Sequence, residues 1–464
     1  MEKFDIIVVG SGPGGYVAAI KAAQLGKSVA VVERAEVGGV CLNWGCIPTK
    51  ALLKSAQAYT YALHCAEYGF EASDVKPDIA KMVERSRGVS AQMSKGVEFL
   101  LKKNKITLIQ GDAMLKSGHT LEVTSDSGEK TMYEADHIIL AVGSRPNSLP
   151  FAPIDGNRII SYRQALVPEK LPKSLAVIGS GAIGSEFAFF YRSLGVEVYL
   201  IEYVDRILPV EDDDVSAQIS RSFRKAGIKV MVSAQVKSVD TTGELCKLTV
   251  QTKKGEEIIE AETVLSAVGV IPNTDFLGLE EIGVEMVRGN KIKVDEHYRT
   301  NVEGVYAIGD IIPTPALAHV ASAEAICCVE AIAGLNPKPI DYAHIPGCTY
   351  ISPEVASVGL TERAAKEKGI DYKVGKFFFL ASGKAVAAGE KDGFVKLIVD
   401  SQTDRILGAH LVGANVTEML SGIVSGMTVG ITASDIIHSV HPHPTMSEAI
   451  MEAAEAAHGN AIHQ

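Results

Sequence analysis

Two cysteines near the start of the chain are separated by four residues, in the segment Cys41-Leu42-Asn43-Trp44-Gly45-Cys46. A disulfide across so short a loop would gain only about 2 kcal/mol from chain entropy, so the pair suits a redox switch better than a structural staple. Pro48 and the apolar run after it predict a helix that begins near Cys46, and a helix N-terminus favours the reactive thiolate. The alternatives are two buried cysteines or a metal site, but a metal site would need a second cysteine pair at metal-binding spacing. We therefore expect redox chemistry here and no metal.

Two glycine-rich turns of the G-x-G-x-x-G type occur in the chain. Each follows a short apolar strand, precedes a helical pattern, and is followed by a second strand that ends in an acid 23 residues after the first glycine. The glycines and the acid are Gly10, Gly12, Gly15 and Glu33 in the first copy, and Gly179, Gly181, Gly184 and Glu202 in the second. Such glycines let the backbone approach a pyrophosphate at a helix N-terminus, and the acid accepts hydrogen bonds from ribose hydroxyls. Two matched copies predict two dinucleotide sites.

Each copy also has a matching later segment, an apolar strand followed by Gly-x-x-Pro-Asn. These segments are Gly143–Asn147 and Gly269–Asn273. Beyond residue 345 the sequence changes to a mixed block of strands and helices that ends in a helical stretch, Ser447–His458. The pattern predicts an α/β protein with two Rossmann-like dinucleotide-binding domains and a C-terminal α+β domain.

Composition excludes several other classes of protein. The 464 residues suffice for about three domains, and the net charge of −11 without a basic run argues against nucleic acid as a partner. The sequence shows neither a secretory signal nor an apolar run long enough to cross a membrane, so we expect a cytoplasmic protein, although a mature organellar form would look the same. Seven cysteines do not suggest a disulfide framework, and the adjacent Cys327 and Cys328 fit core packing.

The glycine turn followed by Cys41-Leu42-Asn43-Trp44-Gly45-Cys46-Ile47-Pro48-Thr49-Lys50 resembles the pyridine nucleotide–disulfide oxidoreductases, and within them the dihydrolipoyl dehydrogenase group. The resemblance covers nearly the whole chain and includes the segments Tyr306–Asp310, Leu317–His319 and His441–Glu448. It implies a discontinuous FAD-binding domain over residues 1–148 and 271–345, an NAD-binding domain over 149–270, and an interface domain for dimerisation over 346–464.

The resemblance also implies a role for each catalytic residue. Cys41 would exchange with the substrate and Cys46 would face the flavin. His443 would act as the base, with its imidazole oriented by Glu448, since a positioned histidine suits proton transfer near neutral pH. Lys50 would lie near the flavin N5 and pair with Glu186.

The implied reaction is the oxidation of dihydrolipoamide to lipoamide with reduction of NAD. The residues implied to bind FAD are Gly10, Gly12, Gly15, Glu33, Lys50, Ala113, Gly143, Asp310 and Ala318. Those implied to bind NAD are Gly179, Gly181, Gly184, Glu202, Val236 and Gly269. A glutamate at the second acid position repels a 2′-phosphate, so we expect NAD rather than NADP.

The implied partners are a second copy of the chain, whose cysteines His443 would serve, and either a lipoyl-bearing acyltransferase or a glycine-cleavage lipoyl protein. Ile271, Trp44 and Pro442 depart from the commonest residues of the family. Rival interpretations are a glutathione-reductase-like or mercuric-reductase-like enzyme, or a mainly scaffolding flavoprotein. The first usually has Val-Pro-Lys-Lys after the second cysteine, and the second needs a C-terminal cysteine pair that the tail after Glu448 lacks.

Overall fold

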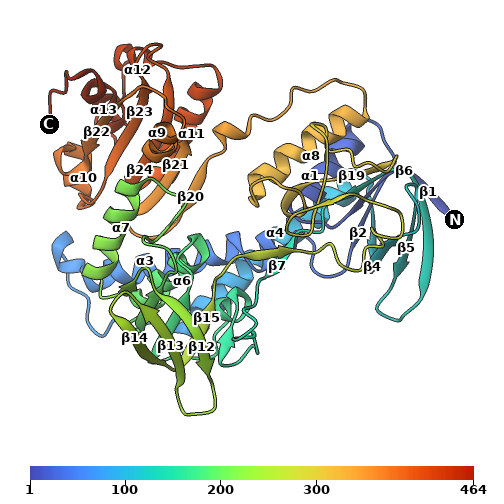
Figure 1. Cartoon of the computed structure of the whole chain (residues 1–464), viewed down its shortest axis with the longest axis horizontal. Helices are drawn as coiled ribbons and strands as arrows, with labels where there is room; N and C mark the ends of the chain where they lie inside the picture. The colour runs from blue at the N-terminus through green and yellow to red at the C-terminus, as the bar shows by residue number, and fades with distance from the viewer. Residues whose placement is uncertain (464) are drawn as a thin grey trace. The chain divides into compact units, whose positions relative to one another are not determined.

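The computed structural model describes residues 1–463, and the chain divides into two compact units (Figure 1). The first unit comprises Met1–Leu52, Ala80–Asn147 and Gly269–Ile340. The second comprises Leu53–Ile79, Ser148–Val268 and the chain from Asp341 onward. Each unit contains one of the two glycine-rich turns. The division into three domains with the boundaries given above stays a prediction.

The first unit is built on a seven-stranded sheet with the order β3-β2-β1-β6-β5-β4, in which β19 also pairs with β6. The strands β1, β2, β3, β6 and β19 are parallel, and β4 and β5 are antiparallel additions. Their bounds are β1 Glu2–Val9, β2 Val29–Glu33, β3 Thr107–Gln110, β4 Asp112–Leu115, β5 Thr120–Thr124, β6 Lys130–Leu140 and β19 Val305–Ala307. Strand β2 is buried along its whole length, and the apolar ends of β1 (Ile6–Val9) and β6 (Ile138–Leu140) are buried as well, as expected when helices cover a parallel sheet.

Two helices of this unit, α1 (Pro13–Gln24) and α8 (Ala318–Ile332), pack against each other. Helix α1 begins at Pro13, because Gly12 takes the N-cap position and proline fits the first turn of a helix. Between β2 and β3 lie α2 (Gly39–Asn43), α3 (Cys46–Leu63), the 3-10 turn η1 (Cys65–Tyr68) and α4 (Ile79–Lys103). Two small hairpin-like pairs complete the unit, β7 (Ser144–Pro146) with β16 (Val270–Pro272) and β17 (Met286–Val287) with β18 (Lys291–Ile292).

The second unit repeats the nucleotide fold in a five-stranded parallel sheet with the order β11-β10-β9-β15-β8. The bounds are β8 Ile159–Ile160, β9 Ser174–Ile178, β10 Glu197–Ile201, β11 Lys229–Met231 and β15 Thr263–Ser266, with helices α5 Tyr162–Leu166, α6 Ala182–Ser193 and α7 Asp213–Lys225. A three-stranded antiparallel sheet is inserted before β15, formed by β12 (Gln235–Asp240), β13 (Cys246–Thr252) and β14 (Gly255–Ala261).

The C-terminal block of the second unit is a five-stranded antiparallel sheet with the order β20-β21-β24-β23-β22. Its strands are β20 Gly347–Thr349, β21 Glu354–Gly359, β22 Tyr372–Phe378, β23 Phe394–Asp400 and β24 Ile406–Gly413. Its helices are α9 Glu362–Glu367, α10 Gly383–Ala388, α11 Val416–Thr428, α12 Ala433–His438 and α13 Glu448–His458. The predicted C-terminal helix is confirmed within one residue.

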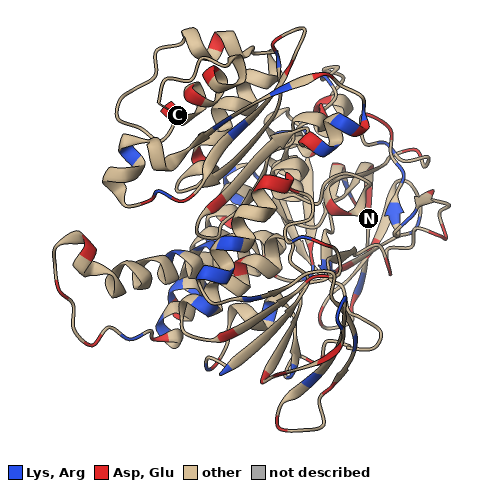
Figure 2. Cartoon of the chain, turned by 60° about the vertical axis from the view of Figure 1, so that its left-hand side comes forward, with Lys and Arg blue, Asp and Glu red and all other residues tan. Residues whose placement is uncertain are grey.

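Charged residues of both signs are interspersed along the chain (Figure 2). None of the helices within residues 1–463 is both long enough and apolar enough to cross a membrane.

Glu211, which precedes α7, is a buried carboxyl group with an unpartnered oxygen, Oε2. Burial, with a smaller contribution from the nearby Asp212 charge, raises the pKa of Glu211 from its usual 4.5 to about 7, against the opposing effect of a hydrogen bond with Ser357. Between these two pKa values the folded chain keeps a proton that the unfolded chain loses. Stability due to this group is therefore present below about pH 4.5 and is lost as the pH rises to about 7, with a total cost of about 3 kcal/mol.

We expect Glu211→Gln to remove this loss, because an amide cannot ionise. The melting temperature of the variant should match that of the unsubstituted protein near pH 5, within the equivalent of about 1 kcal/mol, and exceed it at pH 8. The exposed Glu256→Gln is the matched control and should follow the unsubstituted protein at every pH. Melting curves of Glu211→Gln that stay parallel to those of the unsubstituted protein from pH 5 to 8 would contradict the expectation.

Candidate active site

The two glycine-rich turns have nearly the same geometry, because in both a helix starts close against the end of a strand. Gly10 has a φ of +99° and Gly179 a φ of +97°, values that favour glycine. A Cβ on Gly15 would lie 1.9 Å from the carbonyl oxygen of Gly10, and one on Gly184 would lie 2.0 Å from that of Gly179. No side chain fits at either place. The first and third glycines of each motif are therefore required by the backbone itself.

The middle glycine has a different environment. A Cβ on Gly12 or Gly181 would have no protein atom within 4 Å, so each of these residues faces open space. Both are helix N-caps without a side-chain cap, and the first N–H groups of α1 and α6 are not satisfied by a capping side chain. Such a helix N-terminus, open at a glycine, fits a pyrophosphate.

The glutamate that ends the second strand of each copy accepts hydrogen bonds from the serine of the glycine-rich turn. In the first copy Glu33 Oε2 accepts hydrogen bonds from the Ser11 N–H (2.9 Å) and hydroxyl (2.5 Å), and Oε1 accepts one from the Ala35 N–H (2.9 Å). In the second copy Glu202 Oε2 accepts from the Ser180 N–H (2.9 Å) and hydroxyl (2.7 Å). Its Oε1 accepts from the Val204 N–H (3.0 Å). Each Oε1 has a second lone pair for a ribose hydroxyl, so both carboxylates fit a dinucleotide.

The later Gly-x-x-Pro-Asn segments of the two copies pair with each other in the antiparallel strands β7 and β16. The Asn147 N–H donates to the carbonyl oxygen of Gly269 (3.0 Å), and the Asn273 N–H donates to that of Gly143 (2.9 Å). Both glycines have a positive φ and open space at the Cβ position. Ile271 lies opposite Arg145, so the departure from the family pattern lies in this strand pair.

Asp310 lies in a short turn, η2 (Gly309–Ile311), directly after β19. Its Oδ2 accepts a hydrogen bond from the Ser144 hydroxyl at 2.5 Å. The turn is also held by Glu324, a fully buried acid of α8. Its Oε2 accepts a hydrogen bond from the Gly309 N–H at 2.6 Å. Neither Ser144 nor Glu324 was predicted from the sequence as a site residue. An acid inside the apolar run of α8 was the available signal for Glu324.

The other predicted cofactor contacts lie on regular elements. Ala318 is the first residue of α8, where its backbone N–H is at a helix N-terminus. Ala113 lies in β4 opposite Val123, and Val236 lies buried in β12. Their predicted contacts with a cofactor stay predictions.

Cys41 lies in α2 and Cys46 is the first residue of α3, so the predicted helix start is confirmed. Cys41 and Cys46 are not joined by a disulfide in this structure. A hydrogen bond with Cys46, followed by burial, raises the pKa of the Cys41 thiol well above its usual value, and the charge of Lys50 opposes this shift. This shift favours the protonated thiol form of Cys41 when the pair is reduced.

The loop between the cysteines is held by helix α4. The Arg87 guanidinium donates to the carbonyl oxygen of Asn43 and lies 4.4 Å from the ring centroid of Trp44. The Ser94 hydroxyl donates to Asn43 Oδ1 at 2.9 Å, and the Trp44 indole N–H donates to Glu36 Oε1 at 3.2 Å. Neither Arg87 nor Ser94 was predicted from the sequence, because no local pattern connects a side chain on α4 to a residue such as Asn43, which lies 44 positions before Arg87.

His443 and Glu448 are brought together as predicted. His443 Nδ1 lies 2.8 Å from Glu448 Oε1, while Glu448 Oε2 accepts a hydrogen bond from the Thr445 N–H at 2.7 Å. Burial alone would raise the pKa of Glu448, but the hydrogen bonds from Thr445 and His443 lower it below its usual value. Glu448 holds the ring through Nδ1, and the His443 side chain is 77% exposed.

Lys50 and Glu186 belong to different compact units. Lys50 lies one helical turn after Cys46 in α3, close enough to influence the Cys41 thiol. Glu186 is buried in α6, where its Oε1 accepts a hydrogen bond from the Tyr350 N–H at 3.0 Å. Their predicted ion pair stays a prediction.

Comparison with known proteins identifies the family. Residues 4–325 match the family model described as pyridine nucleotide-disulphide oxidoreductase, and residues 345–454 match the dimerisation domain of that family. The chain belongs to this family. A dihydrolipoyl dehydrogenase of Rhizobium etli is 48% identical to it over 99% of each chain. A mitochondrial dihydrolipoyl dehydrogenase of Pisum sativum is 43% identical over 100% of this chain and 93% of its own length.

A solved structure of a relative supports the same assignment. LpdA from Mycobacterium tuberculosis is 28% identical and matches with a TM-score of 0.90, covering 98% of this chain and 99% of its own. The predicted pyridine nucleotide–disulfide oxidoreductase family is therefore confirmed. The predicted fold class, with two dinucleotide-binding folds and a C-terminal dimerisation domain, is confirmed as well.

The contrast between Gly12 and Gly15 gives a testable prediction for the first nucleotide site. Gly12→Ala should fold normally, because a Cβ on Gly12 has no protein atom within 4 Å. It should bind FAD at least about tenfold more weakly, because the methyl group would occupy the space for the pyrophosphate. Gly15→Ala should instead lower stability by at least about 1–3 kcal/mol, because its Cβ overlaps backbone. Flavin absorbance and melting temperature separate the two outcomes. Normal flavin content in Gly12→Ala, or normal melting of Gly15→Ala, would refute this account.

Proposed function

We propose that this chain oxidises dihydrolipoamide to lipoamide and reduces NAD, with Cys41 and Cys46 as the redox pair and FAD between them and NAD. One observation carries the proposal. A chain 48% identical to a dihydrolipoyl dehydrogenase holds both the cysteine pair Cys41 and Cys46 at a helix start and an exposed His443 bonded to Glu448. A dithiol oxidase needs both parts, since one accepts electrons and the other accepts protons.

The proposed dithiol step uses the cysteine pair and His443 in turn. In the oxidised enzyme Cys41 and Cys46 form a disulfide. His443 takes the proton of one substrate thiol, and the resulting thiolate attacks Cys41 Sγ, so that the Cys46 thiolate leaves. The second substrate thiol then attacks the substrate sulfur of the mixed disulfide and its proton passes to the Cys41 sulfur, which releases lipoamide and leaves Cys41 as a thiol and Cys46 as a thiolate. The raised pKa of the Cys41 thiol fits a proton on this sulfur at the end of the step.

Two dinucleotides complete the reaction. FAD, bound at the first glycine turn, supplies a two-electron carrier between the reduced cysteine pair and the pyridine nucleotide. Glu33 and Asp310 would bind its ribose and ribityl hydroxyls, and Lys50, paired with Glu186, would lie near its N5. NAD would bind at the second turn, where the carboxylate of Glu202 repels a 2′-phosphate and so favours NAD over NADP.

The assembly is part of the proposal. The chain carries the dimerisation domain of its family, and we propose a homodimer in which His443 serves the cysteines of the second copy. The strong exposure of the His443 side chain in a single chain supports this arrangement. We further propose that the dimer serves a lipoyl-bearing acyltransferase or a glycine-cleavage lipoyl protein in the cytoplasm. One relative is mitochondrial by name, so an organellar location fits the same fold.

A steady-state assay with dihydrolipoamide, oxidised glutathione and Hg(II) side by side tests the proposal. We expect turnover of dihydrolipoamide with NAD at least about a hundredfold above that of the other two substrates with either pyridine nucleotide, a difference of about 2.7 kcal/mol in barrier. Faster turnover of glutathione or Hg(II), or a strong preference for NADPH, would overturn it. Anaerobic reduction should also give a long-wavelength thiolate–flavin band, and its absence in FAD-loaded protein would favour a scaffold.

His443→Gln separates the two half-reactions. Loss of the base should slow reduction of the enzyme by dihydrolipoamide by about 10²–10⁴-fold, whereas reduction of bound FAD by NADH should change less than about twofold, because it needs no thiol proton transfer. Stopped-flow flavin absorbance measures both rates. His438→Gln, an exposed histidine on the neighbouring helix α12, is the control and should leave both unchanged. Equal slowing of both half-reactions by His443→Gln would argue against a base.

A further inference from the structure

A row of residues crosses the C-terminal five-stranded sheet, one from each strand. In order across the sheet these are Gly347, Ser357, His410, Lys396 and Lys376, each directly opposite the next. Directly opposed residues of antiparallel strands lie on one face, so the four side chains form a continuous polar row. Lys396 and His410 are each 1% exposed, and a polar row this deeply buried requires polar partners.

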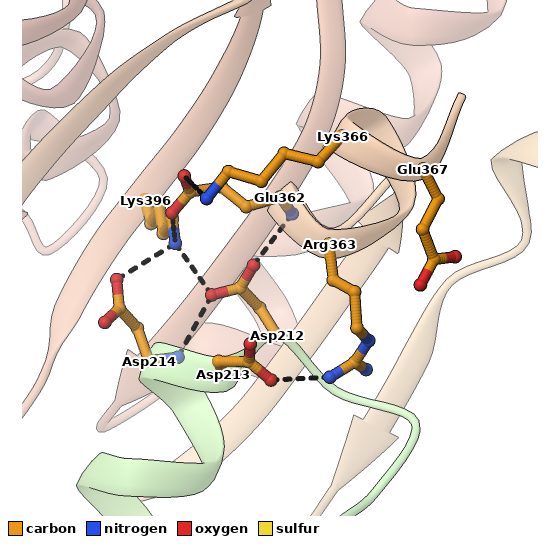
Figure 3. A pocket seen from close by; sticks show the side chains of 8 residues that line it. All are labelled: Asp212, Asp213, Asp214, Glu362, Arg363, Lys366, Glu367 and Lys396. Carbon is orange, nitrogen blue, oxygen red and sulfur yellow. Dashed lines mark hydrogen bonds and ion pairs between the residues drawn. The ribbon is translucent and has the colours of Figure 1, made fainter. Parts of the chain in front are cut away.

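The partners come from the acidic segment Glu211–Asp214, which ends the loop after Glu202 and starts α7 (Figure 3). Lys396 Nζ donates to Asp212 Oδ1 at 2.7 Å, to Asp214 Oδ2 at 2.9 Å and to Glu362 Oε2 at 2.6 Å. Asp212 Oδ2 accepts a hydrogen bond from the Glu362 N–H at 3.0 Å. Glu211 shares a hydrogen bond with Ser357. The acidic segment thus contacts Ser357, Lys396 and Lys376 of the polar row, and Lys376 Nζ lies 3.1 Å from Asp214 Oδ2. His410 instead bonds through Nε2 to the carbonyl oxygen of Leu360 at 2.9 Å.

Lys396 takes the central place that a cation would take in this cluster. Oxygens of Asp212, Asp214 and Glu362 lie within 4.8 Å of one another, a spacing that could suit a metal ion, but the ammonium group already bonds to all three. Burial alone would lower the pKa of Lys396, yet the hydrogen bonds to the carboxylates raise it above its usual value. Removal of this charge would leave three carboxylates close together, two of them partly and one fully buried.

The same segment is connected to the second nucleotide turn. The Glu211 N–H donates to the carbonyl oxygen of Leu208 at 3.0 Å, and the Leu208 N–H donates to that of Ser180 at 3.1 Å. Ser180 in turn donates to Glu202 through its N–H and its hydroxyl. A continuous path of short contacts therefore runs from Lys396 through the loop Tyr203–Asp212 to the carboxylate that faces the ribose site.

The first nucleotide fold shows why this loop matters. There the carbonyl oxygen of Ser11, the counterpart of Ser180, accepts a hydrogen bond from the Gly38 N–H at 3.1 Å. The chain after Gly38 enters α2 and the cysteine pair, which α4 holds in place. In the second fold the chain after Leu208 leads instead into the acidic segment Glu211–Asp214. There the polar row of the C-terminal sheet holds the segment in place, as α4 holds the cysteine loop in the first fold.

We propose that Lys396 is a positioning residue for the pyridine nucleotide, which fixes the loop Tyr203–Asp212 and thereby the orientation of Glu202 at the ribose site. The proposal rests on the proposed function only in placing the pyridine nucleotide at the second glycine turn. Lys396 lies outside that turn and acts through Asp212, Asp214 and Glu362. Its removal should therefore weaken nucleotide binding without changing the chemistry of the cysteine pair.

Lys396→Met in the full-length, FAD-loaded protein tests the inference. We expect the KM for NAD and the Kd for NADH to rise at least tenfold, with kcat changed less than threefold and the KM for dihydrolipoamide unchanged. Lys366→Met is the matched control, because Lys366 pairs with the same Glu362 at 3.5 Å but is 68% exposed. It should change none of these constants by more than twofold.

Two further measurements keep the outcomes distinct. Glu362→Gln weakens the cluster without removing the buried cation and should raise the KM for NAD in the same direction by a smaller factor, so the test survives if Lys396→Met fails to fold. Reduction of bound FAD by NADH needs no dithiol substrate, so it tests the role of Lys396 even if the proposed substrate is wrong. An unchanged NADH affinity in Lys396→Met, or an equal loss of both half-reactions, would overturn the inference.

Discussion

The structure depends on a close approach between the end of the first strand of each nucleotide fold and the start of the helix that follows it. In both nucleotide folds the helix after the first strand starts so near to that strand that only glycine fits, at Gly15 and again at Gly184. This approach brings the first N–H groups of α1 and α6 to the edge of each sheet. A buried carboxylate, Glu33 or Glu202, then fixes the turn through the backbone and hydroxyl of a single serine. The remaining site residues are arranged around these two turns.

Charge burial is the second constraint, and the molecule satisfies it in two ways. Glu33, Glu202 and Glu324 are buried carboxyl groups that accept hydrogen bonds from backbone N–H groups, so each is compensated locally. Lys396 is compensated by three carboxylates from two segments far apart in sequence. A buried ion pair of this kind gives little net stability compared with apolar packing, but it fixes how the groups around it are arranged.

The features that sequence could predict are those whose partners lie close in the chain. The glycine turns, the helix start at Cys46 and the His443–Glu448 pair all depend on spacings of a few residues, and all were found. The contacts of Arg87 with the cysteine loop, of Glu324 with Gly309 and of Lys396 with Asp212 were missed. The Lys396–Asp212 contact joins residues 184 positions apart and the Arg87–Asn43 contact residues 44 apart, so only the folded topology brings them together. Glu324 and Gly309 are only 15 apart, but a turn and a helix start lie between them.

The pairing of β7 with β16 has a consequence for how the chain is assembled. These strands leave and re-enter the first unit, and they are hydrogen-bonded to each other at Asn147–Gly269 and Asn273–Gly143. The 121 residues from Ser148 to Val268 are thus an insertion whose two ends are already joined. The host fold closes on itself without them, so this module can vary in length and sequence while the strands that bracket it stay in register.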